Sequence, residues 1–181
     1  ANAGMSGAVA SEPVHRAPSA AERAALHAEA LFDAGNYDAA LAEFGEAYAL
    51  EGDAERRAAL LHDIAVCHHR MFRYDAAVAF YERYLREGRP SATERQALAR
   101  RIANLKQLVA TVQLHSNVAA TVWVDDRKVG EAPGLIRLSA GSHAIELRAK
   151  RHQSVRRAVL ASGGTHQTLS FELPELPEYE G

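Results

Sequence analysis

Two patterns of apolar residues divide the chain into two parts. Between residues 19 and 110, apolar side chains recur at the three- and four-residue spacing of amphipathic helices. After Leu108 they alternate with polar residues, as in Val112-Gln113-Leu114, which is typical of half-buried strands. We therefore predict an α+β protein of two domains, in which a helical array precedes a small all-β sandwich. The expected limits are a disordered tail over 1–18, helices over 19–110, strands over 111–174 and an acidic tail over 175–181.

Residues that start helices recur along the first part and predict about five helices. Ser19 precedes Glu22, and Ser91 precedes Glu94, at the three-residue spacing of a capping box. A carboxylate, amide or hydroxyl side chain just before a helix accepts hydrogen bonds from its first free amides. The expected helices begin after Ser19, Asn36, Asp53, Arg73 and Ser91.

A ten-residue segment returns 37 residues later, as Gly35–Phe44 and then Phe72–Tyr81. A repeat of this length indicates stacked helix pairs, because no pair can bury its apolar face alone. Small residues stand where neighbouring helices would cross, and aromatic residues stand beside them. These positions are Ala28, Gly35, Tyr37, Ala40, Phe44 and Ala47 in the first unit, and Ala65, Tyr74, Ala77 and Tyr81 in the second.

This pattern resembles the tetratricopeptide repeat over residues 20–90, with the fifth helix as a terminal cap. The family period is about 34 residues, and a longer third helix is expected to absorb the difference. The resemblance implies a concave groove that holds a peptide or a helix of a partner protein. Glu29 and Val66 stand where the family's clamp for a C-terminal carboxylate has Asn, so that ligand is not expected. The residues expected to bind the partner are Phe32, Asp33, His62, His69, Arg70 and Arg73, unless they are only solvated surface.

Short strands separated by turn residues predict the β half. Asp125 to Lys128 is expected to be a polar turn, and Gly163-Gly164 is expected to turn a hairpin. Two adjacent glycines favour a turn because they accept backbone angles that other residues avoid. The expected strands lie over 112–114, 122–124, 135–138, 144–149, 154–160 and 165–173.

The β half also resembles the PEGA domain, a small all-β module of bacterial and archaeal envelope proteins. The resemblance rests on Val124-Asp125-Asp126, Val129-Gly130-Glu131-Ala132-Pro133 and Ala140-Gly141-Ser142-His143. The family's naming tetrapeptide is replaced by Asn117-Val118-Ala119-Ala120. The resemblance implies turn-forming, structural roles, not chemical ones, for Asp125, Gly130, Pro133, Gly141 and His143.

Composition and charge exclude several classes of protein. The net charge of −2 gives no overall attraction to nucleic acid or to anionic membranes. Cys67 is the single cysteine, so neither an internal disulfide nor a cysteine-cluster metal site is possible. No apolar run approaches the roughly 20 residues that span a bilayer. Nucleophile, phosphate-loop and dinucleotide motifs are missing, so we expect no enzyme and no cofactor.

Two clusters of titratable residues raise further hypotheses. His62, Asp63, Cys67, His68 and His69 lie on one expected helix, where a metal- or haem-binding sensor is conceivable. Only two of these side chains converge at a time, so metal binding is not expected. Arg148, Lys150, Arg151, Arg156 and Arg157 surround a predicted hairpin. They form either a polyanion patch or a charged strand edge that blocks unwanted pairing, and the acidic C-terminal tail is placed to neutralise them.

These observations predict a non-catalytic adaptor that binds a protein partner through its helical half. The alternative is a module that binds cell-wall or other polysaccharide through the β half, with Trp123 as its candidate aromatic. The two resemblances together imply an exported protein of the periplasm or cell envelope of bacteria with GC-rich genomes, and a cytoplasmic location remains open. Because the chain begins at Ala1, a cleaved leader is one expectation. The sequence sets neither the partner nor the oligomeric state.

Overall fold

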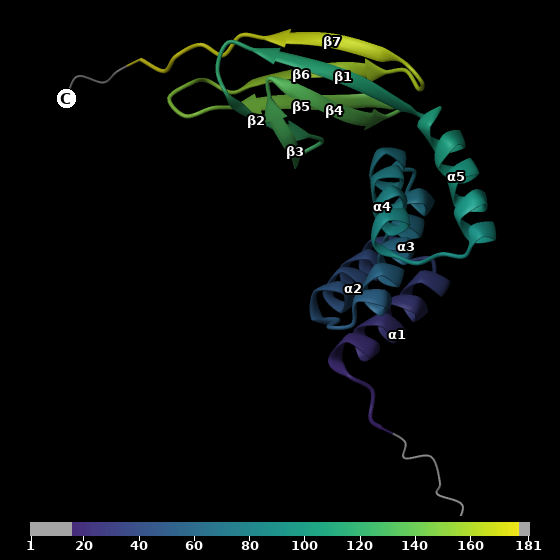
Figure 1. Ribbon diagram of the computed structural model, residues 1–181. Coiled ribbons are helices and arrows are strands. Elements are labelled where there is room, and N and C mark those ends of the chain that lie inside the picture. Colours follow the sequence, from purple (N-terminus) through teal and green to yellow (C-terminus); the bar gives the residue numbers. More distant parts are fainter. Residues whose placement is uncertain (1–15, 178–181) are drawn as a thin grey trace, which may run out of the picture.

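Helices and strands occupy separate halves of the chain in the computed structural model, which describes residues 16–177 (Figure 1). Five helices come first, as the sequence predicts, and seven strands follow where the sequence predicts six, so the α+β fold class is confirmed and one strand is additional. The N-terminal residues 1–15 of the expected tail, and residues 178–181 of the acidic tail, lie outside the described part. The helices are α1 (Ala20–Asp33), α2 (Tyr37–Leu50), α3 (Ala54–Arg70), α4 (Tyr74–Glu87) and α5 (Ala92–Lys106).

Both predicted capping boxes form. The Glu22 amide donates to the Ser19 hydroxyl at 3.1 Å, and the Ser19 amide donates to the Glu22 carboxylate at 2.6 Å. Ser91 and Glu94 repeat this arrangement at the start of α5. Asn36 and Asp53 cap α2 and α3, as expected. These local bonds satisfy amides that would otherwise lack partners, and they fix where each helix begins.

The two helix pairs turn in the same way. Gly35 has a φ of 77°, and the Asn36 amide donates to the Leu31 carbonyl at 2.9 Å. One repeat later Phe72 has a φ of 58°, and the Arg73 amide donates to the His68 carbonyl at 3.0 Å. Both turns are therefore left-handed helix caps of one type. The extra length of the repeat lies in α3, which has 17 residues where α1 has 14.

Small residues pack between the helices where the repeat predicts them. Ala40 of α2 and Ala77 of α4 are both fully buried. Phe44 belongs to the cluster of α1, α2 and α3, and Tyr81 belongs to the cluster of α3, α4 and α5. The helices approach closely at the alanines because a methyl group is all that stands between the backbones.

The β half is a sandwich of a three-stranded and a four-stranded sheet. The strand orders are β4-β1-β7 and β3-β2-β5-β6, and β1 pairs parallel with β7. Alternate residues of facing strands, among them Val112, Val122 and Ile145, are buried between the sheets. The strands are β1 (Val109–Ser116), β2 (Ala120–Val124), β3 (Arg127–Ala132), β4 (Gly134–Ser139), β5 (Gly141–Arg148), β6 (Val155–Ala161) and β7 (His166–Phe171).

The predicted polar turn over Asp125 to Lys128 is wrong in its second half. Only Asp125 and Asp126 form the turn, with φ angles of 48° and 65°, and Arg127 begins β3. Two consecutive positive φ angles characterise the tightest hairpins, so the second strand can start at once. Strand β1 likewise begins at Val109, two residues before the predicted limit of the β domain.

The two halves meet where α4 and the end of α5 contact the sandwich (Figure 1). The Ala140 amide donates to the Leu108 carbonyl at 2.7 Å. Glu82 of α4 pairs with Lys106 at 2.7 Å and with Arg137 of β4 at 3.5 Å. A β-carbon on Gly163 would lie 2.3 Å from the Gln107 carbonyl oxygen, so only glycine allows this close approach. None of the helices within residues 16–177 combines the length and apolarity needed to cross a bilayer.

Candidate partner-binding groove

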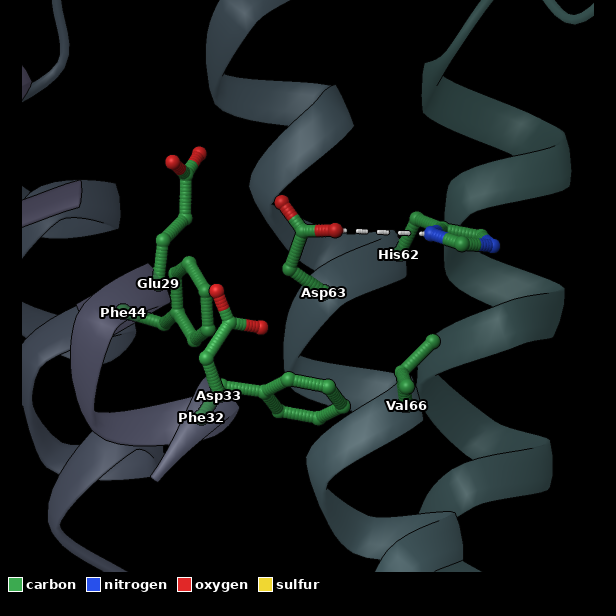
Figure 2. A pocket seen from close by; sticks show the side chains of 7 residues that line it. All are labelled: Glu29, Phe32, Asp33, Phe44, His62, Asp63 and Val66. Atoms are coloured by element: carbon green, nitrogen blue, oxygen red, sulfur yellow. Dashed lines mark hydrogen bonds and ion pairs between the residues drawn. The ribbon is translucent and has the colours of Figure 1, made fainter. Parts of the chain in front are cut away.

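A row of hollows runs across one face of the helical half. The first hollow, of about 410 Å³, lies between α1 and α3, with Phe44 of α2 behind it (Figure 2). The second surrounds the end of α3 and reaches Arg101 of α5, and the third lies between α3, α4 and α5. Val66 lines the first and second hollows, His62 the first and third, and Arg101 the second and third. Because they share residues, we treat them as one feature, the odd-helix groove, named for α1, α3 and α5.

Helical periodicity explains why these side chains share a face. On α3, Asp63, Val66 and Arg70 are spaced by three and four residues, which places them in one row. On α1, Glu29, Phe32 and Asp33 follow the same rule. The core lies beside this row, because the neighbouring positions Ala28 and Ile64 are buried. The helical pattern thus leaves a mixed row of charged and apolar side chains on α1 and on α3 facing the groove.

Five of the six residues predicted to bind a partner line this groove. Phe32, Asp33 and His62 line the first hollow. His69 and Arg70 line the second.

Arg73 lies elsewhere. It stands at the start of α4 and pairs with Asp38 of α2 at 3.0 Å, so it links the two helix pairs to each other. In the repeat, Arg73 is equivalent to Asn36, the residue that caps α2. This position belongs to the turn between helices and not to the groove.

Other groove residues were not predicted as partner-binding residues. Asp63 lines the first hollow, and Phe72, Tyr74 and Arg101 line the second. Phe72 carried a signal in the sequence, since an aromatic residue there replaces the glycine of the first repeat. Arg101 carried none, because its helix was interpreted only as a cap.

Packing sets the protonation of the groove. Burial lowers the pKa of His69, and the Arg101 and Arg70 charges lower it further, so this ring is neutral at pH 7. Burial raises the pKa of the Tyr81 phenol, which the Arg101 guanidinium opposes from 5.9 Å above the ring. Hydrogen bonds from Ser91 lower the pKa of Glu94, so this carboxylate is ionised. The groove therefore carries fixed charges of both signs around aromatic rings.

The histidine-rich helix does not gather its side chains into a site. Burial raises the pKa of Cys67 to about 11, which keeps it a neutral thiol in the core. His68 is buried against Phe80, with ring centroids 5.3 Å apart, while His62 and His69 face the groove. Within residues 16–177, three or more His, Cys, Asp or Glu side chains nowhere group as metal ligands would.

The basic hairpin forms, but its arginines have internal partners. Arg148 pairs with Glu146 at 2.7 Å, and Arg156 pairs with Asp126 at 2.8 Å. Arg157 donates to the Ser170 carbonyl at 2.8 Å. Lys150 and Arg151 stand at the tip, beside a hollow that Glu175 also lines. Much of the charge of the possible polyanion patch is thus balanced by Glu146 and Asp126, residues that the sequence did not suggest.

The aromatic candidate for polysaccharide binding is covered. Trp123 faces away from the buried Val122 and Val124, as predicted, but the Arg148 guanidinium lies 4.3 Å from its ring centroid. A sugar that stacks on this face would have to displace a cation that the ring attracts. This contact weakens the alternative reading of the β half.

Asp125 and His143 hold a turn together, as expected. The Asp125 carboxylate contacts His143 Nδ1 at 2.6 Å and accepts from the Ala144 amide at 2.9 Å. His143 Nε2 lies 2.7 Å from the Ser139 carbonyl. Burial acts to raise the pKa of Asp125, but the Ala144 and His143 hydrogen bonds outweigh it and lower the pKa. All the polar atoms of the pair are used within the fold.

Comparison with known proteins supports the helical part of the reading. Residues 31–102 match the tetratricopeptide repeat family, which confirms that part of the resemblance. No curated protein matches the chain. The match covers α2, α3 and α4, the end of α1 and most of α5, which includes the groove residues from Phe32 to Arg101. Repeats of this family generally mediate protein–protein interactions.

Proposed function

We propose that the protein is a non-catalytic adaptor that binds a protein partner in the odd-helix groove. The observation that carries this proposal is the continuity of three hollows across α1, α3 and α5. Side chains that only cover a helix do not produce a continuous concavity, whereas a bound segment needs one. Aromatic and arginine side chains, which dominate the energetics of many interfaces, line it.

The β half serves as a second contact surface or as a spacer in this proposal. Its packing against α4 and α5 supports this role, because Glu82 and Ser139 tie the halves together.

We also propose a location in the periplasm or cell envelope, on the strength of the PEGA resemblance. Fractionation of the full-length protein in its source bacterium tests the location, and recovery from the cytosol alone would refute it.

A double variant tests the groove. Phe32→Ala with Arg70→Glu removes one aromatic anchor and reverses one charge, and we expect loss of the partner captured by the unchanged chain. The matched control is Leu50→Ala with Arg86→Glu, which makes the same two kinds of change at exposed positions of α2 and α4. Because Phe32 also packs against Tyr37, with ring centroids 5.1 Å apart, circular dichroism and melting must show that the variant is folded. Retention of the partner by the folded groove variant would contradict the proposal.

A further inference from the structure

Equivalent positions of the groove carry opposite charges. Asp33 ends the groove row of α1, and Arg70 holds the same place on α3 one repeat later. The capping boxes at Ser19 and Ser91 align α1 with α5, and in this alignment Arg101 is the position equivalent to Glu29. The two groove-lining carboxylates of α1, Glu29 and Asp33, therefore each correspond to a guanidinium on a later helix.

The wall between α1 and α3 is acidic. Figure 2 shows the carboxylates of Asp33 and Asp63 at the same opening, with the Phe32 ring lying between the two helices. His62 is the one basic side chain among the residues that line this hollow, and its Nδ1 lies 3.5 Å from Asp63. The three carboxylates that line this hollow, Glu29, Asp33 and Asp63, therefore favour a cationic side chain from outside.

The opposite end is basic and aromatic. Arg70 and Arg101 line the second hollow together with Tyr37, Phe72 and Tyr74. Phe72 is 72% exposed and holds a left-handed backbone that is unfavourable for a residue other than glycine. A strained residue with an exposed aromatic ring is typical of a functional position.

We propose that the groove binds a partner segment of fixed polarity, with a basic side chain between α1 and α3 and an acidic side chain at Arg70 and Arg101. An apolar side chain of the same segment lies against Phe72. This inference rests on the proposed function and specifies its ligand. Charge complementarity of this kind sets direction and partner choice more than it sets affinity.

The spacing of the two charges follows from α3. Asp63 and Arg70 are separated by seven residues, which is about 10 Å along a helix axis. An extended chain covers that distance in about three residues. The recognised segment therefore carries its basic and acidic side chains about three residues apart, or about seven apart if it binds as a helix.

The probe is a synthetic peptide, acetyl-Lys-Lys-Leu-Phe-Glu-Glu-amide, titrated into the full ¹⁵N-labelled chain. The control peptide has the same composition with alternating charges. We expect saturable amide shifts at Phe32 and Phe72, with affinity for the polar peptide about threefold or more above that for the control. Equal affinities would overturn the polarity, and shifts confined to residues outside the groove would overturn the proposed function as well. A lack of saturable shifts at about 1 mM peptide would overturn the proposed ligand.

A spin label on the peptide shows in which orientation the peptide binds in the groove. A label at the basic end should broaden the Phe32 amide, and one at the acidic end should broaden the Phe72 amide. Reversing the four charges at the repeat-equivalent positions, by Glu29→Arg, Asp33→Arg, Arg70→Asp and Arg101→Glu, conserves net charge and should exchange the two patterns. If loss of Arg101 over Tyr81 prevents folding, Asp33→Arg with Arg70→Asp should abolish the preference instead. Patterns that do not change in either folded variant would refute the inference.

Discussion

Ser139 of β4 caps helix α4 through Asp75, across the boundary between the two halves. The Asp75 amide donates to the Ser139 hydroxyl at 3.2 Å, and that hydroxyl donates to the Asp75 carboxylate at 2.7 Å. Arg73, at the N-cap position of α4, supplies no side-chain cap of its own. The β half therefore completes a helix of the other half, which couples the orientation of the groove to the sandwich.

Removing this hydroxyl should loosen the junction. We expect Ser139→Ala to lower the free energy of unfolding by about 1–2 kcal/mol, because a partly buried helix end and a carboxylate lose their shared partner. Urea denaturation measures the change. Ser142→Ala, at an exposed position of β5, is the control and should have almost no effect. Equal stabilities of the two variants would show that the cap contributes nothing.

Added volume at a helix crossing should destabilise the array. Ala77 is fully buried between helices, so Ala77→Leu forces the backbones apart and should cost about 1–3 kcal/mol. Calorimetry should show a lower melting temperature. Ala79→Leu adds the same atoms at an exposed position of α4 and should leave the midpoint nearly unchanged. An unaltered midpoint for Ala77→Leu would contradict the close crossing.

The left-handed turn at Phe72 should favour glycine. Phe72→Gly and Phe72→Ala both remove the ring, but only glycine relieves the positive φ. We expect the glycine variant to be more stable than the alanine variant by about 0.5–1 kcal/mol in urea denaturation. Both should bind a groove ligand more weakly than the unchanged chain. An alanine variant as stable as the glycine variant would mean that the turn is not strained.

Burial of His68 should make stability depend on pH. Desolvation lowers its pKa to about 4, with Arg73 and Arg127 acting in the same direction and Asp75 and Asp38 opposing. The unfolded chain, with a His pKa near 6.5, therefore binds more protons between about pH 6.5 and 4. The contribution of neutral His68 to the free energy of unfolding should be fully present above pH 6.5. It should fall by up to ~3 kcal/mol as the pH drops through this window.

Replacing the ring isolates this effect. His68→Phe keeps a flat ring against Phe80 but cannot take up a proton. We expect its unfolding free energy to be much less dependent on pH between 6.5 and 4.5, measured by urea titration at each pH. His27→Phe, at an exposed position of α1, should retain the slope of the unchanged chain.

Local signals made much of this fold predictable. The capping boxes at Ser19 and Ser91 and the alternation around Val122 are set by neighbouring residues, so they can be read directly. Strand β3 was not predicted from the sequence, because it lies at the edge of its sheet. Arg127, Lys128 and Val129 are all exposed there, so buried and exposed residues do not alternate.

The groove was predictable only where the repeat carries it. Phe32 and His69 are equivalent positions on α1 and α3, and both line hollows. Arg101 was missed because α5 has no partner helix to complete a repeat. The partners of the basic hairpin were missed because Asp126 meets Arg156 across 30 residues of chain, which no local pattern reveals.

The parallel pairing of β1 with β7 has a consequence for synthesis on the ribosome. All five helices have been synthesised once Lys106 has been added, and they pack mainly against their neighbours in the sequence. Strand β1 follows at once, but its two neighbours are β4 and the much later β7. Until residue 171 emerges, one edge of β1 has no strand beside it, and such edges are prone to pair with other chains. The last strand therefore closes the sandwich, and a nascent chain that stops before it is the form most exposed to aggregation.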